Sequence, residues 1–328
     1  MPKVTDFKTN IFSLNADTFK SVALELFYLH SNHNPVYKEY LEFLNIQPDK
    51  IKSIEEIPFL PIELFKKHII LPENAKYQTI FESSGTTGME PSRHYIADIE
   101  VYEQSILAGF RHFYGGPEDF VFFALLPSYL ERTHSSLVYM ANFLMKESKT
   151  DAGGFYLYNH AELAENLEKA KKGPRKIFLI GVSFALLDFA DSFPMDLSEV
   201  IIVETGGMKG RREEIIREEL HDTLIKAFNV PVIHSEYSMT ELLSQAYSLK
   251  SGLFKCPPWM QVLIREPNDP FTYFADGQAG GINIIDLANM NSCPFIAIQD
   301  LGRIDDTGFF EVLGRFDNSE IRGCSLLY

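Results

Sequence analysis

The sequence contains little that would direct the chain to a membrane, a nucleic acid or an oxidising compartment. It has three cysteines, Cys256, Cys293 and Cys324, and no CxxC pair or Cys/His cluster, which argues against a zinc site or a disulfide framework. Lys and Arg number 30 against 45 Asp and Glu, so the net charge of −15 disfavours nucleic acid and anionic membranes as partners. We find no apolar run that could span a bilayer and no signal-peptide pattern at the N-terminus. We therefore expect a cytoplasmic protein, without membrane insertion.

The bulk composition is that of an ordinary globular protein. A chain of 328 residues with 45% hydrophobic content can bury one large core or two unequal ones. The 27 phenylalanines would suit an apolar pocket for an acyl or aryl chain, and would suit an ordinary core equally well.

The order of the predicted elements indicates an α/β fold. Residues 1–76 read as helical, with a helix over 17–30 that begins after Asn15 and a pattern then broken by prolines. From residue 77, β-rich runs alternate with helical stretches, which predicts parallel sheets flanked by helices. The expected strand and helix pairs are 120–126 with 134–146, 175–182 with 184–189, and 200–203 with 211–228. Antiparallel strands are expected at 281–287, 295–299 and 309–313, as a small β-rich C-terminal part. The prolines that break the helical pattern of the first segment are Pro35, Pro48, Pro58 and Pro61. The predicted domains are 1–76, a helical segment packed on the core, and 77–328, the core itself.

One loop is rich in hydrogen-bond donors and follows a β-like run over 77–81. Its glycines let the backbone turn and bring N–H groups close to an anion, and its hydroxyls add uncharged donors. It is not a Walker loop, because no lysine follows. The loop consists of Ser83, Ser84, Gly85, Thr86, Thr87 and Gly88. It predicts a phosphate cradle, and a polar turn is the alternative.

Later segments follow in a fixed order: 204–210 (ETGGMKG), 235–241 (SEYSMTE), 300–303 (DLGR), 314–317 (GRFD) and 321–323 (IRG). Together with the loop at 83–88, they resemble the signature motifs of the adenylate-forming superfamily, which includes acyl-CoA synthetases, peptide-synthetase adenylation domains and luciferases. The resemblance implies that superfamily's N-terminal-domain fold and a reaction in which ATP and a carboxylic acid form an acyl-adenylate.

The resemblance also implies roles for single residues. Gly206 and Gly207 would form the turn beside the adenine, and Tyr237 would pack against its ring. Thr240 would bond the α-phosphate, and Glu241 would hold Mg²⁺, a hard cation that prefers carboxylate oxygen. Asp300 would accept both ribose hydroxyls, and Arg315 would contact ribose or phosphate. Judged alone, the glycine turn could be a plain strand-to-helix turn, and Glu241 a solvated residue opening a helix.

The sequence departs from the superfamily pattern in two places. Ser238 stands where a glycine is usual. The chain ends at Tyr328, so we expect no separate C-terminal lid domain and no lysine from it. Lys209 is our candidate for the missing positive charge. His134 resembles a residue placed between nucleotide and acyl pocket, although a helix-capping or surface histidine is the alternative.

One branch of the superfamily ends near this point, the acyl-protein synthetases of the LuxE type. Segments 81–88, 126–129, 204–210, 256–259 and 322–326 resemble that branch. The resemblance implies activation of a fatty acid and transfer of the acyl group to a cysteine near the C-terminus, from which a reductase takes it. By this resemblance the cysteine would be Cys324. A thiolate is the most capable side-chain nucleophile near neutral pH, and an inert terminal cysteine is the alternative.

Three functions remain open at this point. The first is an acyl-protein synthetase, an ATP-dependent acid–thiol ligase that uses Cys324. The second is a ligase that transfers the acyl group to coenzyme A, a carrier protein or an amine, with Cys324 uninvolved. The third is a subunit that binds nucleotide or an acylated partner without catalysis.

Overall fold

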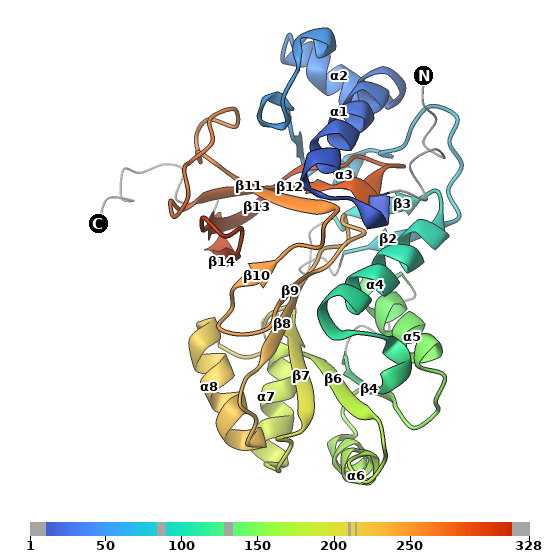
Figure 1. The fold of residues 1–328 in the computed structure, drawn as a ribbon, viewed down its shortest axis with the longest axis vertical. Coiled ribbons are helices and arrows are strands. Elements are labelled where there is room, and N and C mark those ends of the chain that lie inside the picture. The colour runs from blue at the N-terminus through green and yellow to red at the C-terminus, as the bar shows by residue number, and fades with distance from the viewer. Residues whose placement is uncertain (1–10, 84–89, 128–133, 209–210, 214, 317–328) are drawn as a thin grey trace. The chain divides into compact units, whose positions relative to one another are not determined.

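The computed structural model describes residues 11–83, 90–127, 134–208, 211–213 and 215–316 (Figure 1). The chain separates into two compact units. One is Tyr77–Pro257, and the other combines Met1–Lys76 with Pro258–Tyr328. The domains 1–76 and 77–328 stay a prediction.

The unit Tyr77–Pro257 is built on a mostly parallel sheet with the strand order β10-β9-β8-β7-β6-β4-β5. Strands β5, β4, β6, β7 and β8 run parallel, and β9 and β10 are added antiparallel to their neighbours. The bounds are β4 Phe120–Leu125, β5 Gly154–Tyr156, β6 Lys176–Val182, β7 Val200–Thr205, β8 His234–Tyr237, β9 Ala246–Ser248 and β10 Phe254–Lys255.

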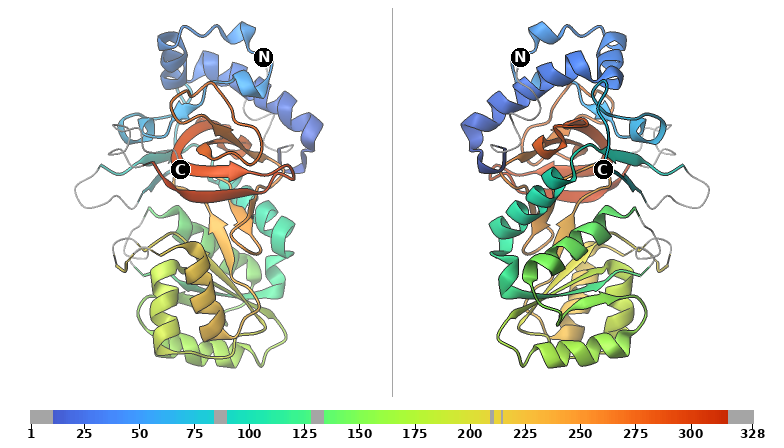
Figure 2. Two further views of the ribbon diagram at one scale, coloured as in Figure 1. Left: turned by 90° about the vertical axis from the view of Figure 1, so that its left-hand side faces the viewer. Right: turned by 90° about the vertical axis from the view of Figure 1, so that its right-hand side faces the viewer.

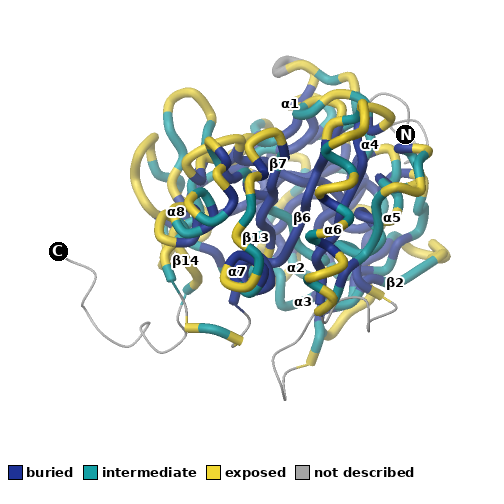
Figure 3. The backbone as a smooth tube through the Cα atoms, turned by 90° about the horizontal axis from the view of Figure 1, so that it is seen from below, coloured by how far each residue is buried: buried dark blue, intermediate teal, exposed yellow. Residues whose placement is uncertain are grey.

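Helices cover both faces of this parallel sheet (Figure 1). Because parallel strands are joined by right-handed crossovers, the reversal of strand order at β4 puts α5 on one face and α6, α7 and α8 on the other. The helices are α4 Ile99–Tyr114, α5 Ser136–Ser148, α6 His160–Ala170, α7 Ser183–Ser192 and α8 Arg217–Phe228. The strand β4, with the sequence FVFFAL, is wholly buried and apolar, and β6 and β7 are mostly buried, as Figure 3 shows.

A separate two-stranded hairpin, β2 Thr79–Glu82 and β3 Arg93–Ile96, belongs to the same unit. Phe81 anchors it to the core, with its ring 5.2 Å from that of Tyr102 in α4 and 5.6 Å from that of Tyr139 in α5. The hairpin is therefore held against the α4 and α5 side of the sheet.

The second unit contains an antiparallel sheet, β11-β12-β13-β14, to which β1 is added parallel to β13. The bounds are β1 Leu60–Pro61, β11 Met260–Arg265, β12 Gly280–Asp286, β13 Phe295–Ile304 and β14 Phe310–Arg315. The helices are α1 Ala16–His33, α2 Pro35–Phe43 and α3 Leu64–Lys67, with short 3₁₀ turns at Ile11–Ser13, Pro48–Lys50, Ile54–Glu56 and Leu287–Asn289.

The helices α1 and α2 pack on this antiparallel sheet (Figure 2), and aromatic side chains make the contact. The ring of Phe295 on β13 lies 6.3 Å from Phe27 and 6.2 Å from Tyr37, and all three residues are buried. Two polar side chains add specific links, since His30 Nε2 lies 2.9 Å from the carbonyl oxygen of Met290 and Asn34 Nδ2 donates to the carbonyl of Ser292 at 2.6 Å. Sequence-distant parts of the chain thus share one core.

The α/β fold with parallel strands, flanking helices and a β-rich C-terminal part is confirmed. The helix expected over 17–30 ends at His33, before Pro35, as expected. Pro35 and Pro48 also begin new helical turns, because proline has no N–H to lose at the first helical position and Asn34 caps α2. One expectation was wrong in detail. The helix expected over 211–228 begins at Arg217.

Candidate functional site

The carboxyl ends of β7 and β8 carry two of the motif segments side by side. Thr205, the last residue of β7, pairs in register with Glu236 of β8. Gly206 and Gly207 follow β7 directly, and Tyr237 ends β8. Loops at the carboxyl edge of a parallel sheet are where such folds bind ligands.

The turn after β7 depends on a glycine. Gly206 has a φ of +73°, a backbone conformation that residues with a Cβ rarely adopt. Ser183, the first residue of α7, directs its hydroxyl toward the carbonyl of Gly206 at 3.5 Å. The glycine of the predicted adenine turn therefore has a conformational reason to be there.

The hairpin β2–β3 forms the base of the predicted phosphate loop. The N–H of Ser83 donates to the carbonyl of Ser92 at 3.0 Å, and the N–H of Ser92 donates to Ser83 Oγ at 2.9 Å. Ser84, Gly85, Thr86, Thr87 and Gly88 lie outside the described residues. At this base, Arg93 Nε donates to Glu82 Oε1 at 3.1 Å, with the Arg93 side chain 40% exposed. The hairpin thus adds a cation that sequence reasoning did not single out.

A buried histidine connects this hairpin to the segment after β8. His94 of β3 is 1% exposed, and its Nδ1 lies 3.0 Å from the carbonyl oxygen of Thr240. Burial lowers the pKa of His94 to about 4, against a smaller raising effect of that hydrogen bond. Glu241, the predicted metal ligand, is also buried, and the ring of Tyr237 lies 5.6 Å from that of Phe254. The residues assigned to phosphate and metal therefore adjoin the loop hairpin.

Glu204, next to the glycine turn, is the centre of a buried polar cluster. Its Oε2 accepts a hydrogen bond from Ser183 Oγ at 3.0 Å. Its Oε1 lies 3.4 Å from Arg217 Nε and 3.6 Å from His221 Nε2. Burial alone would raise the pKa of Glu204, but the hydrogen bond with His221 and the charge of Arg217 bring it below its usual value. Glu204 is thus an ionised residue that ties β7 to α7 and α8.

Glu236 is a second buried carboxyl, with different partners. Thr205 Oγ1 donates to its Oε2 at 2.5 Å, and the side chain of Ser238 is a further hydrogen-bond partner. Its Oε1 is buried with no hydrogen-bond partner among the described residues. Burial and the nearby Glu204 raise the pKa of Glu236. The serine that replaces the usual glycine at 238 therefore has a partner in the fold.

In the other unit, Asp300 and Arg315 face each other across β13 and β14. They are paired in register, and Arg315 Nε donates to Asp300 Oδ1 at 3.1 Å. The Asp300 side chain is 8% exposed and that of Arg315 is 78% exposed. The two predicted ribose-side residues thus lie together.

The remaining predicted residues are less well defined. Cys324 and Lys209 lie outside the described residues. His134 is exposed, and its carbonyl accepts from the N–H of Glu82 at 2.9 Å. Arg212, three positions after Lys209 in the sequence, donates to Asp188 and Asp191 of α7. The catalytic and binding roles of all the predicted residues stay predictions.

Within the described ranges, no group of three or more His, Cys, Asp and Glu side chains is arranged to hold a metal ion. A single carboxylate such as Glu241 fits Mg²⁺ that arrives with a nucleotide, because Mg²⁺ is commonly held by one or two carboxylates plus substrate phosphates. None of the helices in the described part of the chain is long and apolar enough to cross a membrane.

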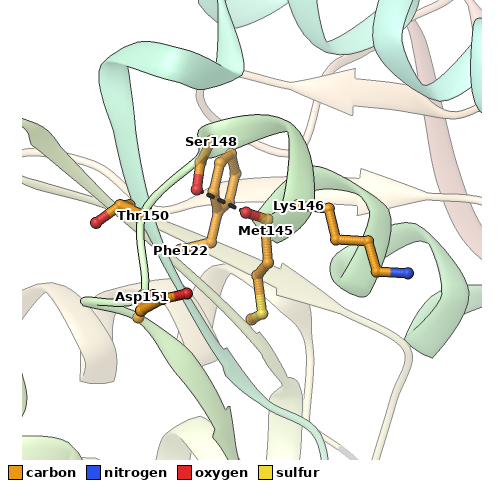
Figure 4. Close-up of a pocket in the computed structure, with 7 residues that line it drawn as sticks. Phe122, Met145, Lys146, Ser148, Thr150 and Asp151 are labelled. Carbon is orange, nitrogen blue, oxygen red and sulfur yellow. Dashed lines mark hydrogen bonds between the residues drawn. The ribbon is translucent and has the colours of Figure 1, made fainter.

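A hollow of about 250 Å³ opens on the unit Tyr77–Pro257, away from the motif residues (Figure 4). It lies by the end of α5 and the loop before β5, at the amino ends of the strands. The lining residues are Phe122, Met145, Lys146, Ser148, Thr150, Asp151 and Gly153. None of them is a motif residue, so we do not assign the hollow to the candidate site.

Comparisons with known proteins identify the fold. No family model matches the sequence, and a search of curated proteins finds no significant match. Among solved structures, 2-hydroxyisobutyryl-CoA ligase in complex with 2-HIB-AMP matches 97% of this chain and 69% of its own, with a TM-score of 0.68 and 14% identity. The same ligase with 2-HIB-AMP and CoA, in the thioesterification state, gives a TM-score of 0.67 at 14% identity, over 97% of this chain and 73% of its own.

ATP-bound MatB from Rhodopseudomonas palustris matches 72% of this chain, with a TM-score of 0.54 and 15% identity. The chain covers only 47% of MatB, about half its length. At these identities the likeness establishes the fold alone, which is that of adenylate-forming ligases.

Proposed function

We propose that this chain activates a carboxylic acid with ATP, forming an acyl-adenylate and pyrophosphate, and then transfers the acyl group to a thiol. The observation that carries the proposal is the meeting of three motif segments within one unit. The turn after β7 lies beside the end of β8, and His94 joins the base of the phosphate loop to Thr240. The fold shared with 2-hydroxyisobutyryl-CoA ligase, which was solved with its adenylate, supports the same chemistry.

In the adenylation step, a carboxylate oxygen of the substrate attacks the α-phosphorus of ATP. A new bond forms between that oxygen and the phosphorus, the bond to the bridging oxygen breaks, and pyrophosphate leaves. We assign the phosphates to residues 83–88 and Thr240, and the adenine to Gly206, Gly207 and Tyr237. Hydrogen-bond donors fixed before the reaction stabilise the charge that develops on the departing oxygen.

Further roles follow from the same assignment. Asp300 accepts from the ribose hydroxyls, and Arg315 contacts ribose or phosphate. Lys209 supplies positive charge at the α-phosphate, and His134 lies between nucleotide and acyl group. Glu241 would hold Mg²⁺, whose chemistry is to neutralise charge on the phosphates as pyrophosphate departs.

For the second step we propose Cys324 as the acceptor, as in acyl-protein synthetases of the LuxE type. The thiolate sulfur attacks the acyl carbon, the bond from that carbon to the phosphate oxygen breaks, and AMP leaves. The thiol proton goes to solvent before the attack, since the thiolate is the nucleophile. A fatty acid is the proposed substrate, and a reductase or carrier protein the proposed final acceptor.

The second candidate is direct transfer to coenzyme A. It is favoured by the likeness to 2-hydroxyisobutyryl-CoA ligase, whose structure with CoA matches 97% of this chain. In this version the sulfur of coenzyme A attacks the adenylate and Cys324 takes no part.

The first experiment is ATP–pyrophosphate exchange with the full chain, across fatty, hydroxy and aromatic acids. We expect exchange that requires both an acid and Mg²⁺. Glu241→Gln should lower the rate about 100-fold, in the range of losing a transition-state charge contact. Glu218→Gln, at an exposed position on α8, is the matched control and should leave the rate unchanged. A folded wild-type chain that binds ATP but exchanges no pyrophosphate with any acid would be a non-catalytic subunit.

The second experiment separates the two acceptors. After incubation with ATP and the best acid, intact mass should show one acyl adduct that hydroxylamine removes. The adduct should be absent from Cys324→Ser and present in Cys256→Ser. If Cys324→Ser forms acyl-CoA at the wild-type rate when coenzyme A is supplied, the coenzyme A candidate holds instead.

A further inference from the structure

His94 joins the β2–β3 hairpin to the segment that ends at Glu241. In β3 the buried positions alternate, so His94 and Ile96 face inward while Arg93 and Tyr95 are more exposed. The His94 side chain therefore lies on the buried face of the hairpin. Its Nδ1 reaches the carbonyl oxygen of Thr240, 146 residues further along the chain.

The chemistry of this contact fixes the state of the ring. A carbonyl oxygen can only accept, so Nδ1 of His94 must carry the hydrogen. Because the pKa of His94 falls to about 4, the ring is neutral at pH 7 and holds this one tautomer. The link is thus a neutral hydrogen bond inside the core.

Both ends of the link belong to predicted nucleotide-binding elements. The hairpin is also anchored by Phe81, which pairs in register with His94 and packs against Tyr102 and Tyr139, and the N–H of Glu82 donates to the carbonyl of His134. The segment after β8 is anchored at its start by Glu236, through Thr205. The contact of His94 with the carbonyl of Thr240 lies further along this segment, directly before Glu241.

We propose that His94 is a positioning residue for the nucleotide: its Nδ1–H holds the carbonyl of Thr240, and so fixes the backbone that carries the Thr240 and Glu241 side chains relative to the β2–β3 hairpin. The inference rests on the proposed function and extends it to a residue that touches neither substrate nor metal. It assigns a functional reason to a histidine in the core.

The test compares substitutions that place an N–H at different positions. ATP affinity should depend on that position if His94 positions the nucleotide, and should not if its role is merely structural. Asparagine can present an N–H near the position of histidine Nδ1, and glutamine near Nε2, so His94→Asn should keep the affinity for Mg²⁺-ATP within about twofold. His94→Gln and His94→Leu should bind Mg²⁺-ATP about tenfold more weakly or worse, since the Thr240 carbonyl loses its donor. Affinity is measured by calorimetry, with pyrophosphate exchange alongside, and thermal melting confirms that each variant is folded.

His30 offers the matched control. It is also fully buried, its Nε2 contacts the carbonyl of Met290, and its pKa is likewise lowered to about 4. His30→Gln and His30→Leu should shift the melting temperature without changing ATP affinity. Nitrogen-15 NMR of the wild-type ring supplies a readout independent of mutation, and should show hydrogen on Nδ1 of His94 across pH 5.5–8.

The outcomes separate the two proposals. Wild-type ATP affinity in both His94→Gln and His94→Leu, or a ring with hydrogen on Nε2 alone, would overturn the role of His94 and leave the adenylation proposal intact. Failure of the wild type to bind ATP would overturn the proposed function, and this inference with it.

Discussion

Glu204 and Glu236 occupy consecutive rungs of the ladder between β7 and β8, yet their pKa values shift in opposite directions. Both carboxyl groups are buried, at 4% and 5% exposure. Glu204 faces Arg217 and His221, and its pKa is lowered. The hydrogen-bond partners of Glu236 in the described part of the chain are the side chains of Thr205 and Ser238, and burial raises its pKa. The edge of the sheet that we assign to the nucleotide thus contains one carboxylate and one group that tends to keep its proton.

Replacing Glu204 should destabilise the unit Tyr77–Pro257. In Glu204→Gln, the guanidinium of Arg217 and the ring of His221 lose a buried charged partner, which we expect to cost about 2 kcal/mol or more of unfolding free energy. Urea unfolding measures the change. Glu165→Gln, which breaks an exposed pair with Lys169, is the control and should cause no measurable loss. Equal stability of the two variants would contradict the role assigned to Glu204.

Glu236 should reveal its proton through the pH dependence of stability. A carboxyl whose pKa is raised in the folded state stabilises the fold at low pH, and that stability is lost as pH rises from the unfolded value through the folded one. Glu236→Gln mimics the neutral acid. The unfolding free energy of this variant should therefore increase relative to that of the wild type as pH rises above about 4.5, by up to about 1.4 kcal/mol per pH unit. Urea unfolding at stepped pH measures the difference. Parallel profiles would show that Glu236 is ionised in the fold.

Several of the strands and helices could be predicted because their signals are local, whereas others, such as β8 and β11, were not predicted. The apolar run of β4 and the alternation of strand and helix after residue 120 are readable one segment at a time. The helix after β7 was expected six residues too early, because the charged residues 211–213 suit a helix start as well as a loop. The end of α1 before Pro35 was predicted, but the start of α2 at Pro35 was not, because a proline can stand first in a helix as well as end one.

The site was only partly predictable, for a different reason. Motif order identified Gly206, Tyr237, Thr240 and Glu241 as neighbours, and the register of β7 and β8 brings the first two together. Motif order did not identify His94, because its partner Thr240 is 146 residues away and no local pattern marks a histidine as buried. Contacts of this kind depend on tertiary structure.

Asp300 should discriminate between ribose and deoxyribose if it accepts from the ribose hydroxyls. We expect the wild type to have kcat/KM for 2′-deoxy-ATP or 3′-deoxy-ATP about tenfold or more below that for ATP, since a hydrogen bond to a charged acceptor is lost. Asp300→Asn should reduce kcat/KM for ATP. It should also shrink the ratio of kcat/KM for ATP to kcat/KM for the deoxynucleotide, because the substitution and the missing hydroxyl remove the same interaction. Pyrophosphate exchange with each nucleotide measures it. An undiminished ratio in the variant would remove Asp300 from the ribose site.

Acid should weaken the fold through its buried histidines. Burial lowers the pKa of His30 to about 4, while the unfolded chain takes up the proton near 6.5, so the stability from keeping this ring neutral is present above pH 6.5 and lost as pH falls toward 4. His30→Gln removes one such group, so its unfolding free energy should fall less steeply than that of the wild type between pH 6.5 and 4, by up to about 1.4 kcal/mol per pH unit. Above pH 7 the two slopes should coincide. Chemical unfolding across this range is the measurement, and equal slopes below pH 6.5 would mean that His30 is protonated in the folded protein.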